Sequence, residues 1–295
     1  YLQGVIPPHI AAGANLSFFP LGHLFRHSGA FFIRRKIAGD AIYGLTLSRY
    51  IRKLLKEGHS MEFFIEGGRS RTGKTLPPRF GLLNYIADAI CDGTVRNVTI
   101  IPLALSYERI MEVESYTREL AGKDKQKEDI TGLVKSAQVL DSRYGRLYLT
   151  AGRPIRLAEF MQKQIGKPAS EMTDEEKRYL ITKVGYLILT RINRASVVNP
   201  SGLAACTLLS HHRRGISMTK FLETAGFLLD VAAKRGYPIS ITLERAAKSA
   251  MQRLARAKER AASEGDPRLP DLARGQAVSA ILEEALEMFG AQGYV

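Results

Sequence analysis

The sequence predicts an α/β protein with a mostly parallel sheet flanked by helices, followed by an all-helical C-terminal region. Short apolar runs over residues 30–33, 61–65, 98–105 and 146–150 alternate with segments of helical periodicity, which is typical of parallel sheets. After residue 166 only helical periodicity remains. A chain of 295 residues with 45% hydrophobic content has material for two domains, which we expect over residues 1–165 and 166–295.

Two strand-like runs are each followed by basic residues. The run over residues 30–33, which we expect to be buried, ends in Arg34-Arg35-Lys36, and the run over residues 61–65 leads into a turn with several arginines. A helix over residues 43–55, ended by Gly58, separates them, and another is expected over residues 82–90. Because ligands bind outside the carboxyl ends of strands in such sheets, we expect both basic clusters to face one crevice.

The C-terminal region begins after a polar break at residues 166–171. Thr173 and Glu176 have the spacing of a capping box at the start of a helix. Further helices are expected over residues 219–234, where Gly236 follows, and over residues 243–262 and 276–289.

Composition restricts the partners. The formal net charge of +14 favours an anionic partner, such as a phosphate metabolite, an acidic carrier protein, anionic lipid or nucleic acid. Two cysteines are too few for a disulfide framework, and Cys91 and Cys206 lack metal-ligand spacing, which indicates a reducing compartment. No run of about 18 apolar residues occurs, so a membrane, if one is involved, should be bound at its surface.

The run MEFFIEGGRSRTGKT over residues 61–75 fits two incompatible signatures. Gly68, Gly73, Lys74 and Thr75 match the phosphate-binding loop of nucleotide hydrolases. That loop needs a helix to begin at the Lys-Thr pair, so that backbone N–H groups converge on phosphate. Pro77 and Pro78 follow almost at once and oppose a helix start, which argues against nucleotide binding.

The second signature is a lipid-enzyme motif. GAFFIRR at residues 29–35, FIEGGRSR at residues 64–71 and IPL at residues 101–103 resemble, in order and spacing, the second, third and fourth blocks of the glycerol-3-phosphate acyltransferase family. Its bacterial membrane-associated members are the closest match. The flanking segments 7–16 and 197–210 are also similar, so the resemblance covers roughly residues 1–235.

The resemblance implies transfer of a fatty acyl group from acyl-CoA or acyl-acyl carrier protein to the sn-1 hydroxyl of glycerol 3-phosphate, with no cofactor and no metal. It further implies a peripheral protein at an anionic membrane surface, on the cytoplasmic face of the inner membrane. The implied substrate-binding residues are Arg34, Arg35, Glu66, Gly67, Gly68, Arg69, Ser70 and Arg71, and Phe32, Ile33 and Pro102 are implied strand residues that support them.

Those residue types suit a phosphate substrate. Arginine stays charged and donates two hydrogen bonds to one anion. Gly67 and Gly68 would allow backbone N–H groups to approach the phosphate, or allow a sharp turn. Glu66 has two candidate roles, orienting an arginine, which we favour, or accepting a substrate hydroxyl.

The family's first block carries a histidine, the general base, with an aspartate five residues later. None of the six histidines here has that spacing. We therefore expect the pair to lie upstream of Tyr1 and the chain as given to be inactive. His27 lies near the second block, but without a carboxylate partner in view it is a poor substitute base.

Two alternatives share some of these features. Dihydroxyacetone-phosphate acyltransferases share every motif. A basic nucleic-acid-binding module would fit the sequence pI of about 9.8, but the arginine clusters follow strands and do not line one helix, so we expect no nucleic-acid partner.

Overall fold

The computed structural model describes residues 6–34, 39–68, 70, 74–108, 146–210 and 218–240. The chain forms two compact units, each assembled from separate segments of sequence. Unit 1 contains Tyr1–Pro102 and Arg153–Arg191, and unit 2 contains Leu103–Gly152 and Ile192–Val295. The division of domains at residue 165 stays a prediction.

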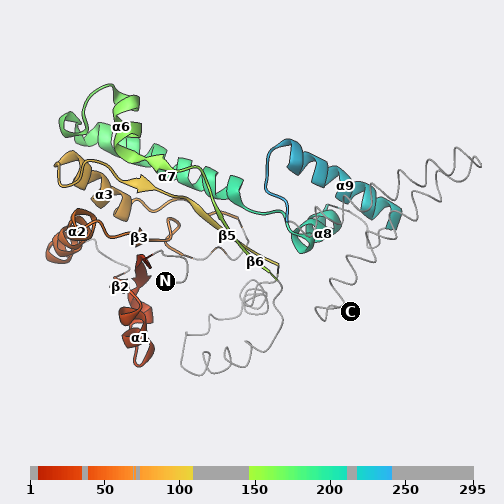
Figure 1. The fold of residues 1–295 in the computed structure, drawn as a ribbon, viewed down its shortest axis with the longest axis horizontal. Coiled ribbons are helices and arrows are strands. Elements are labelled where there is room, and N and C mark those ends of the chain that lie inside the picture. The colour runs from red at the N-terminus through yellow and green to blue at the C-terminus, as the bar shows by residue number, and fades with distance from the viewer. Residues whose placement is uncertain are drawn as a thin grey trace, which may run out of the picture. The chain divides into compact units, whose positions relative to one another are not determined.

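A three-stranded parallel sheet positions the sequence motifs in unit 1 (Figure 1). Its central strand is β1 (His9–Gly13), flanked by β2 (Ala30–Ile33) on one side and β3 (Met61–Glu62) on the other. Ile10 of β1 pairs with Ala30 of β2 and with Glu62 of β3. The two outer strands are therefore level at that point, and both run toward the same edge.

The connections between these strands are helical. The 3₁₀ turn η1 (Ala14–Leu16) and helix α1 (Leu21–His27) lie between β1 and β2, and α2 (Ala41–Lys56) lies between β2 and β3. Helix α2 begins where the Asp40 side chain accepts the backbone N–H of Tyr43 at 2.9 Å, and Gly58 follows its end with φ +77°. Helix α3 (Gly81–Cys91) follows β3, so the helices expected over residues 43–55 and 82–90 are confirmed.

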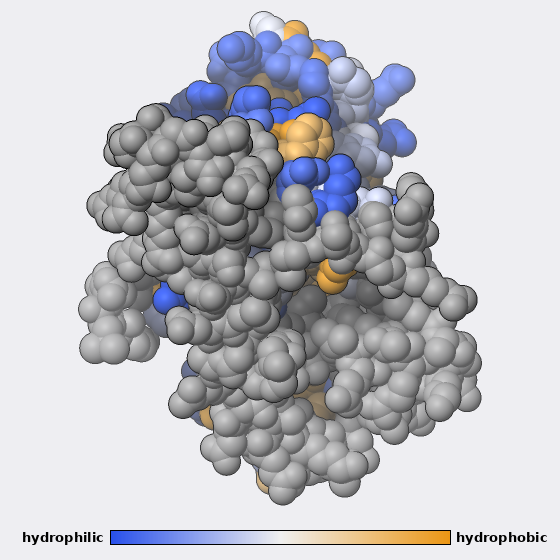
Figure 2. All heavy atoms as spheres, turned by 90° about the vertical axis from the view of Figure 1, so that its right-hand side faces the viewer, coloured by the Kyte–Doolittle hydropathy of each residue, from blue (hydrophilic) through white to orange (hydrophobic). Residues whose placement is uncertain are grey.

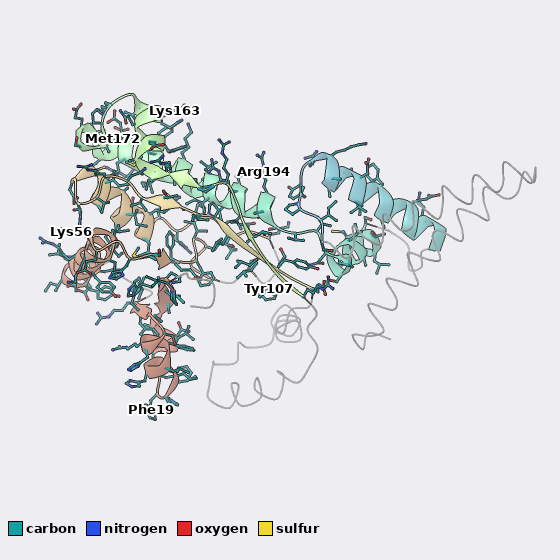
Figure 3. The ribbon with its side chains drawn as sticks, in the orientation of Figure 1. Phe19, Lys56, Tyr107, Lys163, Met172 and Arg194 are labelled. Carbon is teal, nitrogen blue, oxygen red and sulfur yellow. The ribbon has the colours of Figure 1, made fainter. Side chains whose placement is uncertain are left out.

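Unit 1 also contains a second, antiparallel pair of strands and the start of the helical region. Strand β4 (Thr99–Ile100) pairs with β7 (Ile155–Arg156), and α6 (Leu157–Ile165), η2 (Ala169–Glu171) and α7 (Asp174–Ala195), whose last four residues belong to unit 2, follow. Figure 3 labels Lys163 near the end of α6 and Met172 shortly before α7. Most of the large buried apolar side chains of the unit come from its helices, among them Leu47, Ile51, Leu54, Leu83, Ile86, Leu157, Met161, Leu180, Ile181 and Val184.

The capping box at the start of α7 is confirmed. Glu176 Oε2 accepts the backbone N–H of Thr173 at 2.8 Å, and Thr173 Oγ1 accepts the backbone N–H of Glu176 at 3.3 Å. The Lys167 ammonium donates to the same carboxylate, and with Thr173 it lowers the pKa of Glu176. Further along α7, Lys177 binds Asp88 of α3 at 2.8 Å and joins the two helices.

Unit 2 is built on an antiparallel ribbon of β5 (Leu103–Tyr107) and β6 (Leu147–Ala151), with α8 (Pro200–Leu209) and α9 (Met218–Lys234). Tyr107, labelled in Figure 3, is the last residue of β5, and its carbonyl accepts the Asn199 side-chain amide at 2.9 Å. Asn199 also caps α8 by accepting the backbone N–H of Gly202. The expected helix over residues 219–234 is confirmed as α9, and Gly236 after it has φ +72°.

The prediction of a mostly parallel sheet holds only for β1, β2 and β3. The run over residues 98–105 is not one strand, because Pro102 has no N–H to donate to a ladder and interrupts it between β4 and β5, which pair antiparallel with different strands. The strand over residues 30–33 is half-buried, where a buried strand was expected. The strand expected over residues 61–65 is shorter, since only Met61 and Glu62 pair.

The all-helical C-terminal region is not confirmed in full. Its described residues are mainly helical but include a parallel bridge between Val198 and Ile239. The helices expected over residues 243–262 and 276–289 lie outside the described residues.

Apolar and polar side chains are mixed on the surface. The described part of the face in Figure 2 is mainly hydrophilic, with scattered apolar residues. Phe19, labelled in Figure 3 just before α1, is 83% exposed. In the part of the chain that the structure describes, no helix is both long enough and apolar enough to cross a membrane.

A close helix contact gives the first testable prediction. A Cβ atom at Gly185 of α7 would lie 2.8 Å from Phe80 Cε1 and 3.2 Å from Pro78 Cβ. Gly185→Ala should therefore lower the free energy of unfolding by about 1–2 kcal/mol, because overpacking outweighs the gain in helix propensity. Gly226→Ala in α9, where a Cβ meets nothing within 4 Å, should raise it by about 0.5–1 kcal/mol. Chemical denaturation measures both, and equal signs for the two variants would contradict the packing argument.

Candidate functional site

The parallel sheet brings two sequence motifs to one edge. Arg34 follows β2 and Glu66 lies four residues after Glu62, and Ala30 and Glu62 are both level with Ile10 of β1. Arg34 and Glu66 therefore lie beyond the carboxyl edge of the sheet, which is where parallel sheets bind ligands. Arg35, Arg69 and Arg71 lie outside the described residues.

Arg34 is held at the start of α2. Its Nη1 donates to Asp40 Oδ2 at 3.0 Å, its guanidinium carbon lies 4.7 Å from the centre of the Tyr43 ring, and its backbone N–H donates to the Tyr43 hydroxyl at 3.1 Å. The side chain is nevertheless 62% exposed. Asp40 uses its other oxygen to cap α2, so one carboxylate fixes both the helix start and the arginine. Arg34 is thus oriented and still accessible to an anion from solvent.

The segment after β3 turns sharply and is closed by hydrogen bonds. The Gly67 N–H donates to the Phe64 carbonyl at 2.9 Å, and the Arg79 N–H donates to the Ile65 carbonyl at 2.7 Å. Glu66 Oε2 accepts the backbone N–H of Leu76 at 2.6 Å. This last contact is a role for Glu66 that the sequence did not suggest. We call residues 67–75, which lie between these contacts, the basic loop.

The two glycines of the motif have different surroundings. Gly67 has φ +62°, which is in the left-handed region, and a Cβ there would lie 2.9 Å from Arg79 Cγ. Gly68 does not have a positive φ, and among the described residues a Cβ there would meet nothing within 4 Å. The turn therefore requires glycine at residue 67, whereas packing does not require it at residue 68.

The supporting residues fall into two groups. Phe32 and Ile33 lie on β2, are half-buried and pair with Ala12 and Gly13 of β1. Pro102 is fully buried but lies between two strands, so its placement on a strand was wrong. Ser70 is half-buried in the basic loop.

The helix start that the alternative nucleotide-binding loop requires is absent from the described residues 74–80. Residues 75–80 contain no helix, and α3 begins only at Gly81. No helix therefore opens at Lys74-Thr75, where the nucleotide-binding motif requires it.

Three described histidines lie at the opposite, amino edge of the sheet. His9 is the first residue of β1, and its ring lies 5.0 Å from that of His59, which shortly precedes β3. His27 ends α1 just before β2, and its Nδ1 lies 2.9 Å from the carbonyl oxygen of His23. Because the four residues of β2 extend about 13 Å, His27 is far from Arg34 for a base acting on a substrate bound there. His211 and His212 lie outside the described residues.

The profile of the acyltransferase family matches residues 2–106, which contain the parallel sheet and Arg34. Residues 116–282 match a second profile, described as the glycerol-3-phosphate acyltransferase C-terminal region. The chain belongs to the glycerol-3-phosphate acyltransferase family.

Curated proteins similar to this chain are named after the same activity as the family. Proteins named glycerol-3-phosphate acyltransferase are 39% identical in Pseudoalteromonas translucida over 82% of this chain, and 38% identical in Aeromonas hydrophila over 80% of it. The relative in Pasteurella multocida is 37% identical over 76% of the chain. The alignments span 30%, 30% and 28% of those relatives, so the chain spans less than a third of their length.

The two glycines make a matched pair of variants. Gly67→Ala should lower the free energy of unfolding by at least about 1–2 kcal/mol, the cost of a left-handed residue with a Cβ, to which the contact with Arg79 adds. Gly68→Ala should change it by less than about 0.5 kcal/mol. Chemical denaturation measures the free energy of unfolding of both variants. A Gly68 variant as unstable as the Gly67 variant would contradict the argument that there is room for a Cβ at residue 68.

Proposed function

We propose that the chain binds the phosphate of glycerol 3-phosphate at the carboxyl edge of its parallel sheet, within an enzyme that transfers a fatty acyl group to the sn-1 hydroxyl and yields lysophosphatidate. The observation that carries the proposal is the placement of Arg34 and Glu66 beyond one sheet edge in a chain of this family. The names of the curated relatives support the substrate. The acyl donor is a thioester of coenzyme A or of acyl carrier protein.

The chemistry of the site explains why arginines recur there. A phosphate dianion taken from water needs charged donors that replace its hydration, and a guanidinium donates two parallel hydrogen bonds. Arg34 has the accessibility this requires and is already oriented by Asp40 and Tyr43. Arg35, Arg69 and Arg71 are proposed as further ligands, with Gly68 and Ser70 next to them in sequence.

Acyl transfer also needs a base for the attacking hydroxyl. No histidine of this chain has an aspartate five residues later, and His9, His27 and His59 lie at the amino edge of the sheet. The base in this proposal is therefore a histidine–aspartate pair that these 295 residues do not contain, and residues 1–295 supply the phosphate site.

The product is a lipid, and we propose that the enzyme works at the cytoplasmic face of the inner membrane, bound peripherally. The formal charge of +14 supports attraction to anionic lipid, to which each nearby lysine or arginine contributes about 1 kcal/mol.

Replacing one arginine tests the phosphate site. Arg71→Ala should weaken binding of glycerol 3-phosphate by roughly 2–5 kcal/mol, the cost of removing one partner of a buried charge pair, and Arg71→Lys should recover little because lysine lacks the planar fork. Isothermal titration calorimetry on residues 1–295 measures this. Arg178→Ala is the control, since Arg178 lies on α7 and donates to the Asp174 carbonyl. Unchanged affinity in the Arg71 variant would contradict the proposal.

The base is tested by turnover. Residues 1–295 should bind glycerol 3-phosphate but transfer no acyl group above background, whereas a longer chain that carries the family's histidine–aspartate pair should be faster by about 10²–10⁴-fold, the typical contribution of a positioned base. Release of the free thiol from a fatty acyl thioester follows the reaction. Acyl transfer by residues 1–295 alone would place the base within them.

Membrane binding is tested by co-sedimentation with liposomes. Residues 1–295 should sediment with vesicles that contain anionic lipid at low ionic strength and be released as the ionic strength rises, because salt screens the attraction. Vesicles of neutral lipid are the control. Equal binding to both kinds of vesicle, unaffected by salt, would remove the electrostatic part of the proposal.

A further inference from the structure

The segment that closes the basic loop has few backbone donors. Residues 76–79 read Leu-Pro-Pro-Arg, and proline has no N–H, so only Leu76 and Arg79 can donate from the main chain. Both donate back to the residues that precede the loop: Leu76 to Glu66 Oε2 at 2.6 Å, and Arg79 to the Ile65 carbonyl at 2.7 Å. Every backbone donor of this segment is thus used to close the loop.

The residues around these bonds are packed. Ile65 is only 6% exposed, and Pro78 is buried. Pro78 and Phe80 approach Gly185 of α7 so closely that a Cβ there would lie 3.2 Å and 2.8 Å from them. At the other end of the loop, a Cβ at Gly67 would lie 2.9 Å from Arg79 Cγ. The base of the loop is therefore fixed to the scaffold of unit 1.

The two closing bonds differ in kind. The bond from Arg79 is between backbone groups and does not depend on a side chain at residue 65. The bond from Leu76 needs the Glu66 carboxylate, which spans ten residues of sequence to reach it. A carboxylate that accepts a backbone N–H forms a charge-assisted bond, which is shorter and stronger than a neutral one.

We propose that Glu66 is a positioning residue of the phosphate site: its carboxylate accepts the Leu76 N–H and holds together the two ends of the loop that contains Arg69 and Arg71. This rests on the proposed function, because the loop is taken to bind phosphate. A closed loop has lost part of its conformational freedom before the ligand arrives, so binding loses less entropy. Glu66 then acts through Leu76 and not by contact with the substrate.

This role differs from the two that the sequence suggested. A carboxylate that orients an arginine, or that accepts a substrate hydroxyl as a charged group, needs its negative charge. A carboxylate that accepts one N–H needs only an oxygen at that place, which glutamine also has. Glu66→Gln and Glu66→Ala therefore separate the roles.

The donor side offers a second matched pair. Leu76→Ala and Leu76→Pro both shorten the side chain, but only proline removes the N–H. Glu159→Gln on α6 is the control for loss of a carboxylate, since Glu159 forms an exposed pair with Arg156. If closure is the function, combining Glu66→Ala with Leu76→Pro should weaken binding no more than either change alone.

Two measurements on residues 1–295 are made for each variant whose cooperative unfolding shows that it folds. Amide hydrogen exchange reports the closing bonds at Leu76 and Arg79, and calorimetry with glycerol 3-phosphate reports the site. We expect Glu66→Ala to speed exchange at Leu76 on the order of tenfold and to weaken binding by a similar factor. Glu66→Gln should stay within about threefold of the unaltered chain in both, and Leu76→Pro should weaken binding well beyond Leu76→Ala.

Three results would overturn the proposal. In the first, Glu66→Gln binds glycerol 3-phosphate as poorly as Glu66→Ala although its Leu76 amide stays protected from exchange. The negative charge of Glu66 would then act directly on the substrate or on an arginine. Equal exchange at Leu76 in the unaltered chain and in Glu66→Ala would mean that the bond does not close the loop. Equal binding by Leu76→Pro and Leu76→Ala would mean that the N–H is not required. If the unaltered chain binds no glycerol 3-phosphate, the proposed function fails, and exchange at Leu76 still decides whether Glu66 closes the loop.

Discussion

The parallel pairing of β1 with both β2 and β3 is the constraint on which the site depends. Ile10 pairs with Ala30 on one side and Glu62 on the other, which sets the two outer strands level. Parallel neighbours end at the same edge, so the residues after each strand are brought together although about thirty residues separate them in sequence. Adjacent strands lie about 4.8 Å apart, and β2 and β3 are therefore separated by about 10 Å across β1. A slip of the register would move one motif along the sheet relative to the other.

The two motifs at that edge are supported in different ways. Arg34 is oriented by Asp40 and Tyr43, which belong to the start of the next helix and remain at the surface. The basic loop is supported at its two ends. Gly67 turns the chain at one end, and at the other the N–H groups of Arg79 and Leu76 donate to the Ile65 carbonyl and the Glu66 carboxylate. Functional side chains on loops are commonly positioned by such a rigid scaffold.

Sequence patterns predicted those features that depend on neighbouring residues. Helices α2, α3 and α9, the capping box of Thr173 and Glu176, and the failure of a helix to begin at Lys74 all follow from spacing, caps and prolines within one or two turns. The central strand was not predicted, because three of the five residues of β1, HIAAG, are alanine or glycine, which have weak strand preference. The division of residues 98–105 at Pro102 depends on two partner strands, of which the sequence predicts β6, as the run over residues 146–150, but not β7 or either pairing. The bond from Leu76 to Glu66 joins a side chain to a backbone group ten residues away, for which no periodic signal exists.

The prolines that exclude a nucleotide-binding loop also decide how a phosphate can be held here. In a nucleotide-binding loop, backbone N–H groups at a helix start are directed at the phosphates. In this chain Pro77 and Pro78 have none, the N–H groups of Leu76 and Arg79 are occupied by Glu66 and Ile65, and α3 begins only at Gly81. Residues 76–79 therefore have no backbone donor left for an anion. In the proposed phosphate site these four residues would therefore add no backbone donor, and the arginines of the motif would supply donors in place of a helix start.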